Sequence, residues 1–296
     1  MTNVDDQQLP IYVGLDGSDI ALEACRWAAH YADRGHVPIT LVHALPDVQW
    51  YLGAAAIADE NALFEELRTI GNRALSAAEA LLHEIAPTVK VETVLTRNPI
   101  AAFIASVSES ASLVVVGSSH RNVLSDLVLG GETIRICNSA KSPVLVWKPS
   151  KEAHTDTVLP VVVGVDYSDR SNQVVVTAFE YARALGAPLI ANHLWQIGAA
   201  VGIGYSAVLV DWEGIRAEQT RRLHELMDPL CEKFADVKTT MTAIEGSPGR
   251  RLQELSAQAQ LVVVGSRGHS KLVGAVLGSV SQNMIHHSDC SVLVVH

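Results

Sequence analysis

The chain has 296 residues, 48% of them hydrophobic, which is enough for one large domain or two ordinary domains with their own cores. Its net charge of −10 at pH 7 argues against binding nucleic acid by neutralising phosphates. The four cysteines form no CxxC pair, the first residues are polar, and no apolar run reaches the roughly 18–20 residues of a membrane span. We therefore expect a cytoplasmic protein with no nucleic-acid or membrane partner.

The sequence repeats itself once, with an offset of about 149 residues. The run Leu-Val-Val-Val-Gly occurs at 113–117 and again at 261–265, and the segment 11–18 matches 161–168. A period this long indicates a duplicated domain, because solenoid repeats are far shorter. The stretch between the copies is polar and unpatterned, so we predict domains at 1–150 and 158–296.

Along the first half, short apolar runs alternate with longer helical patterns. Ser18 is predicted to cap a first helix that stops at Gly35. A second helix is indicated by apolar residues at helical spacing, namely Leu63, Leu67, Ile70 and Ala74.

The second half has the same pattern. Strands are expected near 160–166, 188–194, 238–244, 261–265 and 291–295. Ser168 is predicted to cap a helix ending near Gly186, and residues 213–235 to form the next helix. Continuous apolar strands alternating with helices favour a doubly wound α/β fold, with a parallel sheet covered by helices on both faces.

A glycine-rich segment follows the strand at 261–265. Gly265, Gly268 and Gly278 have the spacing Gly-x2-Gly-x9-Gly, and a helix is expected to begin near Ser279. This layout turns backbone N–H groups and a helix N-terminus towards one point, which suits a phosphate. The glycines remove side chains and permit positive φ angles, while Arg267 and Lys271 add positive charge.

The first strand of the second half ends in Asp166. In doubly wound sheets, ligands bind beyond the carboxyl ends of the strands, where the strand order reverses. If this strand lies beside the strand at 261–265, Asp166 and the glycine-rich segment face one crevice.

The first half departs from this pattern. Gly117 and Gly130 remain, but His120 stands where the second glycine should be, and Gly131 replaces the serine. Glu132 follows at the expected helix start, where its charge would repel a phosphate or simply cap the helix. We therefore predict that the first half binds a nucleotide weakly or not at all.

The motif Val-Gly-Val-Asp-x-Ser, followed by Gly-x2-Gly-x9-Gly-Ser, resembles the universal stress protein family. The resemblance covers both halves and points to a tandem bacterial member of the ATP-binding type. It implies two Rossmann-like domains, each with a five-stranded parallel sheet of order 3-2-1-4-5, and ATP with Mg²⁺ in the crevice. The implied nucleotide site comprises Asp166, Leu194, Gly265, Arg267, Gly268, Gly278, Ser279, Val280 and Ser281. The weaker site of the first half comprises Asp16, Ala44, Gly117, Gly130 and Gly131.

The leading hypothesis is thus a stress-response or signalling protein in which ATP occupancy changes conformation or assembly. The alternatives are a slow ATPase or nucleotidyl-transfer enzyme, a nucleotide-free interaction module with an unknown protein partner, and a binder of AMP or a cyclic nucleotide. No obvious general base accompanies the loop, so we expect no enzyme beyond a slow ATPase.

Other features have simpler interpretations. His43 and His193 recur after the second strand of each half; they could line the nucleotide pocket, but they are interpreted chiefly as structural histidines at strand ends. His286 and His287 lack neighbouring ligand residues, so no metal site is predicted. The glycines at 202–204 lie outside a first strand–helix turn and are rejected as a dinucleotide motif. The last strands are apolar edges, which the family uses for pairing, so we expect an intrachain pseudo-dimer, with further pairing into a homodimer as an open alternative.

Overall fold

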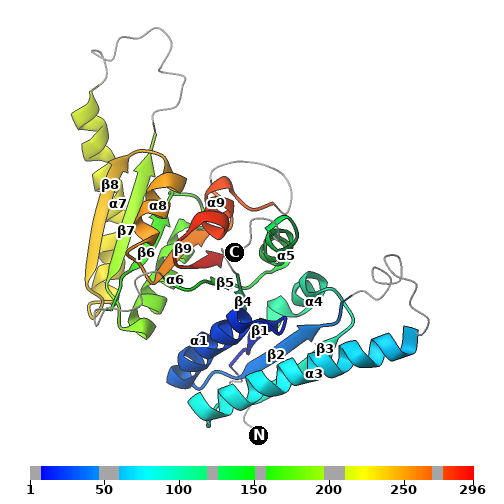
Figure 1. The fold of residues 1–296 in the computed structure, drawn as a ribbon. Coiled ribbons are helices and arrows are strands. Elements are labelled where there is room, and N and C mark those ends of the chain that lie inside the picture. Colours follow the sequence, from blue (N-terminus) through cyan, green and yellow to red (C-terminus); the bar gives the residue numbers. More distant parts are fainter. Residues whose placement is uncertain (1–7, 47–59, 119–125, 151–157, 197–210, 269–275) are drawn as a thin grey trace, which may run out of the picture. The chain divides into compact units, whose positions relative to one another are not determined.

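The computed structural model describes residues 8–46, 60–118, 126–150, 158–196, 211–268 and 276–296. The chain divides into two compact units, Met1–Lys148 and Pro149–His296 (Figure 1). His120, Lys271 and the glycines at 202–204 lie outside the described residues. Within the described part of the chain, no helix combines the length and the apolar character needed to span a membrane.

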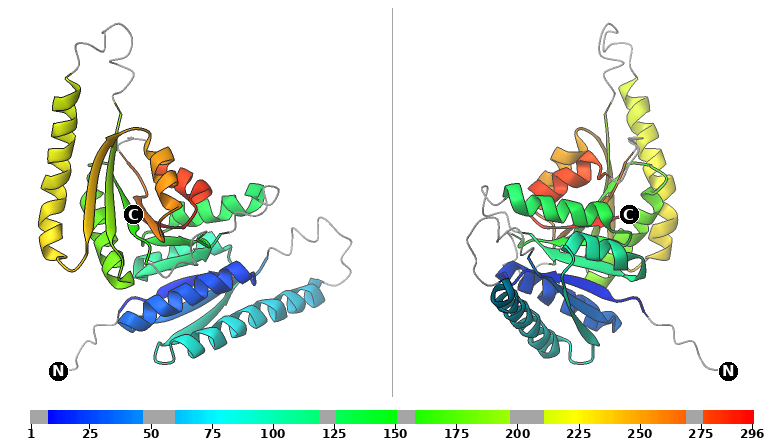
Figure 2. Two further views of the ribbon diagram at one scale, coloured as in Figure 1. Left: turned by 60° about the vertical axis from the view of Figure 1, so that its left-hand side comes forward. Right: turned by 90° about the vertical axis from the view of Figure 1, so that its right-hand side faces the viewer.

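The first unit is a parallel sheet with strand order β3-β2-β1-β4-β5. Its strands are β1 (Ile11–Leu15), β2 (Ile39–Ala44), β3 (Val91–Thr96), β4 (Leu113–Gly117) and β5 (Val144–Trp147). Its helices are α1 (Asp19–Gly35), α3 (Glu60–Ile85), α4 (Ile100–Val107), the short 3₁₀ helix η1 (Ser108–Ser110) and α5 (Asp126–Ser139). Helices α1 and α3 pack together, as do α4 and α5, and the two pairs cover opposite faces of the sheet (Figure 2).

The second unit repeats this arrangement with strand order β10-β9-β6-β7-β8, again all parallel. Its strands are β6 (Val161–Val165), β7 (Leu189–Trp195), β8 (Thr239–Glu245), β9 (Leu261–Gly265) and β10 (Ser291–Val295). Its helices are α6 (Ser171–Leu185), α7 (Trp212–Lys233), α8 (Pro248–Ser256) and α9 (Ser279–His287). Helix α6 packs with α7 and α8 packs with α9, so the predicted doubly wound α/β class is confirmed for each unit.

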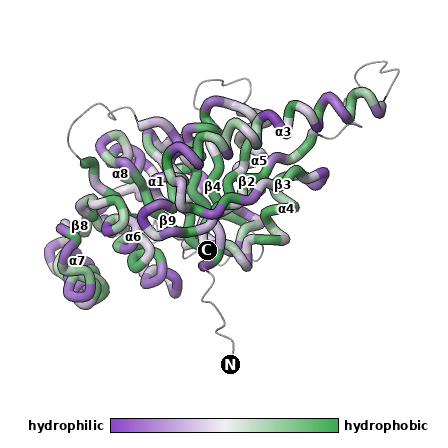
Figure 3. Tube along the Cα trace, turned by 90° about the horizontal axis from the view of Figure 1, so that it is seen from below, coloured by the Kyte–Doolittle hydropathy of each residue, from purple (hydrophilic) through white to green (hydrophobic). Residues whose placement is uncertain are grey.

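The core of each unit lies along its central strands. Residues of β4 and of β9 up to the final glycine are buried, and the tube of Figure 3 is mainly hydrophobic there. The outer helices α3 and α7 alternate between hydrophilic and hydrophobic turns, as expected for helices with one solvated face (Figure 3). The parallel strands are therefore buried from both sides, which explains their continuous apolar sequences.

Most predicted helix ends are confirmed. Ser18 caps α1 by accepting a hydrogen bond from the Ala21 amide at 3.2 Å. Gly186 takes the left-handed conformation after α6, with φ 63°. Helix α1 ends at Gly35, but the left-handed residue is His36, with φ 51°.

Two local predictions are wrong. Ser168 does not cap α6, because its hydroxyl and amide bond to Asp166 and the helix begins three residues later, at Ser171. The apolar stripe of α3 is rotated by about one residue: Ile70 is exposed, and the buried face carries Gly71, Leu75, Ala78 and Leu82. A glycine is needed at position 71 on this face, because a Cβ there would stand 2.7 Å from Leu95.

Candidate functional site

A cavity of about 490 Å³ opens at the carboxyl end of the sheet in the second unit. Strands β6 and β9 are neighbours, so the residues that follow them meet at this edge. All nine residues of the predicted nucleotide site line the cavity: Asp166, Leu194, Gly265, Arg267, Gly268, Gly278, Ser279, Val280 and Ser281. The structure thus brings residues that are up to about 115 positions apart in sequence into one pocket.

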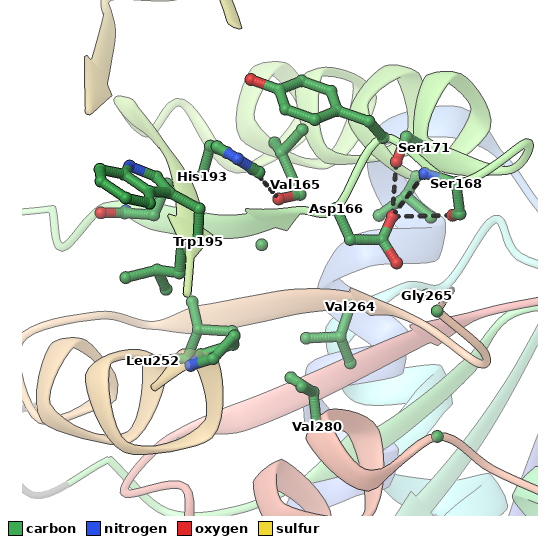
Figure 4. Close-up of a pocket in the computed structure, with 18 of the residues that line it drawn as sticks. Val165, Asp166, Ser168, Ser171, His193, Trp195, Leu252, Val264, Gly265 and Val280 are labelled. Carbon is green, nitrogen blue, oxygen red and sulfur yellow. Dashed lines mark hydrogen bonds between the residues drawn. The ribbon is translucent and has the colours of Figure 1, made fainter. Parts of the chain in front are cut away.

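Asp166 is held rigidly at the centre of this pocket. One carboxylate oxygen, Oδ1, accepts hydrogen bonds from the Ser168 amide at 3.0 Å, the Ser168 hydroxyl at 2.7 Å and the Ser171 hydroxyl at 2.6 Å. Figure 4 shows the carboxylate between these donors and the wall formed by Val264 and Gly265. The three bonds to Oδ1 leave the second oxygen, Oδ2, directed towards Gly268.

The two ends of the glycine-rich segment are tied together. The Ser266 carbonyl accepts hydrogen bonds from the Gly278 amide at 2.8 Å and from the Ser281 hydroxyl at 3.3 Å. The Ser281 hydroxyl also donates to the Gly278 carbonyl at 2.9 Å. Ser281 is fully buried, so its hydroxyl supports the loop from behind.

The glycines serve close approach, and the predicted use of positive φ is wrong for both. Gly278 has φ −66°, and Gly268 is not among the residues with positive φ. A Cβ at Gly268 would instead stand 2.8 Å from Asp166 Oδ2, and one at Gly278 would stand 3.5 Å from the Arg267 Cα. The chain segments therefore meet so closely that position 268 has no room for a side chain.

Helix α9 begins at Ser279, as predicted, directly at the pocket. Gly278 is its N-cap residue and provides no side-chain cap. The first amides of a helix have no partner within the helix, so those of Ser279, Val280 and Ser281 can accept an anion. Arg267, from the same loop, adds a positive charge.

Positive charge also gathers behind this loop. Burial, together with the neighbouring cations Arg170 and Arg267, lowers the pKa of His296 to about 4. The imidazole is therefore neutral at physiological pH and adds no positive charge to that of the two arginines.

The opposite wall of the pocket includes the predicted residue Leu194, together with Tyr167, Trp195 and Arg222, which sequence reasoning missed. Strand β7 continues past its last pair with β6, Val165 with His193, so that Leu194 and Trp195 border the crevice. The His193 ring lies 4.1 Å from the Tyr167 ring, and the Arg222 guanidinium lies 4.6 Å above that ring. The Tyr167 hydroxyl donates to the Gln219 carbonyl at 3.1 Å.

His193 has the structural role predicted for it. Its Nδ1 lies 2.8 Å from the Val165 carbonyl (Figure 4). Its Nε2 lies 3.1 Å from the Gln219 side chain. Burial lowers the pKa of this ring despite the opposing effect of these contacts, so the neutral form is favoured. Burial lowers the pKa of His43 in the first unit in the same way.

Arg222 carried no usable sequence signal, because only the tertiary fold brings α7 over the turn after β6. Tyr167 has φ 56°, a conformation more typical of glycine. The first unit has Gly17 at this position, with φ 84°. Comparison of the two halves could have marked position 167, because a tyrosine replaces a turn glycine there.

In the first unit, the corresponding residues are arranged differently. Asp16 follows β1 and accepts bonds from the Ser18 amide at 2.9 Å and the Ser18 hydroxyl at 2.6 Å. Ala44 and Gly117 end β2 and β4, but a Cβ at Gly117 would stand 2.9 Å from Ile20. The contact with Ile20 closes the space beside Gly117 from the α1 side.

The expected helix start at Glu132 is wrong. Helix α5 already begins at Asp126, so Gly130, Gly131 and Glu132 lie within it. The Glu132 carboxylate accepts a hydrogen bond from the Ala101 amide in the first turn of α4, at 3.4 Å, and lies 3.5 Å from Arg135. Glu132 therefore caps the neighbouring helix, and the glycine pair does not form a loop before a helix.

A metal site would need clustered ligands. Among the residues that the structure describes, no group of three or more His, Cys, Asp or Glu side chains could hold a metal ion. His286 and His287 have ring centroids 6.0 Å apart at the end of α9.

The fold and the pocket define a protein of two tandem α/β domains, with a cavity at the carboxyl end of the second sheet, and comparison with known proteins identifies its family. The sequence model of the universal stress protein family matches residues 9–148 and again residues 158–296. The chain therefore belongs to the universal stress protein family and contains two copies of its domain.

Individual relatives agree with this assignment. A universal stress protein of Mycolicibacterium smegmatis is 32% identical over 290 residues, covering 96% of both chains. One of Mycobacterium tuberculosis strain H37Rv is 32% identical over 304 residues, covering 97% of both. The crystal structure of a universal stress protein from Archaeoglobus fulgidus matches with a TM-score of 0.69 at 16% identity, covering 97% of this chain and 95% of that one.

Proposed function

We propose that the second domain of this universal stress protein binds ATP, and that occupancy of the site biases conformation or assembly in a stress response. One observation carries the proposal: an acid, a glycine-rich loop and an uncapped helix N-terminus line the same cavity of about 490 Å³. A cavity of this size is in the range of ligand pockets.

The residues fit the parts of ATP. The phosphates would lie on the first amides of α9 and beside Arg267, where the helix dipole and the guanidinium favour negative charge. Among the residues that the structure describes, Asp166 is the only acidic side chain lining the pocket, and a carboxylate accepts hydrogen bonds from ribose hydroxyls. The base would lie against the end of β7, near Leu194.

Mg²⁺ fits this pocket as a companion of the phosphates. Mg²⁺ keeps several waters and is commonly bound through one or two carboxylates and the substrate's own phosphates. Among the described residues, Asp166 is the one carboxylate lining the cavity, and it is assigned to the ribose, so the metal ligands would be phosphate oxygens and water. The protein would then recognise the metal only as part of the nucleotide.

The proposed activity is binding and not turnover. Hydrolysis of ATP needs a group that positions the attacking water. The lining carboxylate, Asp166, accepts three hydrogen bonds through Oδ1, and His193 contacts Val165 and Gln219. Any ATPase activity should therefore be slow.

The first domain is proposed to bind nucleotide poorly or not at all. Its helix α5 starts before the glycine pair, and Ile20 closes the space at Gly117. The unequal pair also fits the replacement of Ser279 by Gly131 in the first copy.

The test is the nucleotide content of the purified full-length protein. The protein would be denatured, and the released nucleotide identified and counted by chromatography and mass spectrometry. We expect about one ATP per chain, lost in Gly278→Glu and kept in the matched variant Gly130→Glu. Absence of bound nucleotide, together with no thermal shift in excess Mg-ATP, would contradict the proposal and favour a nucleotide-free interaction module.

A further inference from the structure

One buried polar residue in the pocket is not required by the fold. Asn192 lies on β7, pairs with Gly164 of β6 and is 2% exposed. In the first unit the same register position, opposite Gly14, is occupied by Val42, which is fully buried. The domain therefore folds with an aliphatic side chain at this place.

The amide of Asn192 is only partly satisfied. The Thr242 hydroxyl donates to Asn192 Oδ1 at 2.7 Å, but Nδ2 has no hydrogen-bond partner among the described residues. Turning the amide by 180° only exchanges the two atoms, because Thr242 can then accept from Nδ2 while Oδ1 loses its partner. In either orientation one buried polar atom is unpaired, which costs stability relative to valine.

The position of Asn192 links it to the base end of the pocket. It lines the cavity together with Leu194, two residues further along β7 and on the same face of the strand. Gly164 and Leu252 of α8 lie on this face too, since a Cβ at Gly164 would stand 2.9 Å from Leu252. A base against Leu194 would thus have its inner edge next to Asn192.

We propose that Asn192 reads the base of the bound nucleotide, donating from Nδ2 to N7 of adenine and accepting at Oδ1 from the N6 amino group. The two lone pairs of Oδ1 allow it to accept from Thr242 and from the base together. This is the geometry by which asparagine recognises adenine in nucleic acids. Guanine presents two acceptors, N7 and O6, so Oδ1 would face another acceptor.

This inference rests on the proposed ATP site and names its base specificity. Binding of ATP, 7-deaza-ATP and GTP to the full chain would be measured by calorimetry for the wild type and for Asn192→Val. 7-Deaza-ATP lacks only the N7 acceptor. We expect the wild type to bind it about tenfold more weakly than ATP, and Asn192→Val to bind both equally with reduced preference over GTP. The control is Ile190→Val, a truncation on the same strand outside the cavity lining.

The outcomes separate the two proposals. If the wild type binds no nucleotide, or Gly278→Glu keeps full binding, the ATP site itself is wrong. If ATP binding depends on Gly278 but 7-deaza-ATP binds equally well, or the ratio is unchanged in Asn192→Val, only the base-reading role is overturned. The variant Asn192→Asp, which keeps the size but removes the donor to N7, gives a second test: its preference for ATP over 7-deaza-ATP should be lost.

Thermal unfolding without ligand adds an independent measurement. Asn192→Val removes the unpaired amide, so we expect its Tm to equal or exceed that of the wild type. A clear fall in Tm would show that the contact with Thr242 stabilises the fold, and would overturn the argument that the asparagine is present for a ligand.

Discussion

The Asp166 carboxylate occupies the space in which a side chain at position 268 would begin. Its Oδ2 lies 2.8 Å from where a Cβ on Gly268 would stand, closer than real Cβ atoms approach other atoms. The end of β6 and the glycine-rich loop after β9 are therefore fitted to each other, and each fixes the shape of the other.

Replacing Gly268 by alanine should disturb this fit. We expect Gly268→Ala to displace the Asp166 carboxylate, to lower Tm by about 2–4 °C and to weaken ATP binding about tenfold. Calorimetric titration and thermal unfolding measure the two effects. Gly278→Ala is the control for the fold, because its Cβ would meet its nearest neighbours at 3.5 Å and its φ is −66°. Equal stability of the two variants would contradict the prediction.

Ser171 is expected to position Asp166. Its hydroxyl donates to Asp166 Oδ1 at 2.6 Å, whereas the first unit has Ala21 at this place. Ser171→Ala should weaken ATP binding about five- to tenfold. A hydrogen bond to a charged group contributes about 1.5 kcal/mol, and the two bonds from Ser168 to the same oxygen would offset a small part of that loss. Ser171→Thr keeps the hydroxyl and should restore binding. If alanine and threonine behaved alike, the hydroxyl would have no positioning role.

Tyr167 combines a strained backbone with extensive side-chain contacts. A left-handed φ of 56° costs about 1–2 kcal/mol in a non-glycine residue, so the contact between the Tyr167 and His193 rings must offset that cost. Tyr167→Gly relieves the strain but loses the ring, and we expect a net destabilisation of about 1–2 kcal/mol in urea unfolding. Tyr167→Phe loses only the bond to the Gln219 carbonyl and should cost about 1 kcal/mol. A Tyr167→Gly variant more stable than the wild type would show that the backbone strain costs more free energy than the ring contacts contribute.

The stability of the protein should fall in mild acid. Burial lowers the pKa of His193 below its ordinary value of 6.5, so the unfolded chain binds this proton more readily than the folded one. The contribution of His193 is complete above about pH 6.5 and is lost as the pH falls from there towards the folded pKa. His43 and His296 act in the same direction.

Urea unfolding between about pH 5 and about pH 7.5 measures this dependence. His193→Gln, which cannot take up the proton, should show a shallower decline than the wild type. His83→Gln, at an exposed position of α3, is the matched control. Parallel curves for the wild type and His193→Gln would contradict the role assigned to His193.

The sequence predicts the order of strands and helices in this protein well, and the contacts between their side chains less well. The repeat, the alternation of apolar strands with helices and the start of α9 at Ser279 all follow from local patterns, and the structure has them. The spacing Gly-x2-Gly-x9-Gly also placed the right residues at one cavity, since parallel strands put their carboxyl ends at one edge. Whether those residues bind a nucleotide remains a prediction.

What the sequence could not predict depends on competition between neighbours. Ser168 is a good helix cap by type, but Asp166 competes for its hydroxyl and its amide. Glu132 fits a helix start by type, but α5 begins six residues earlier. Arg222 reaches the pocket only because α7 packs over the turn at Tyr167. Asn192 did leave a signal, a polar residue in a strand whose counterpart in the first half has valine.

The hydrogen bonds at the Ser266 carbonyl have a consequence for transplanting the site. They join residue 266 to residues 278 and 281, so the two ends of the glycine-rich segment are held together by groups outside positions 269–275. The segment from residue 266 to residue 281 can therefore be transferred as one unit, together with the hydrogen bonds that join its ends. The smallest exchange that would carry these hydrogen bonds with it is a graft of the segment from Ser266 to Ser281 onto the first half. The substitution Ile20→Arg would accompany it, to reproduce Arg170.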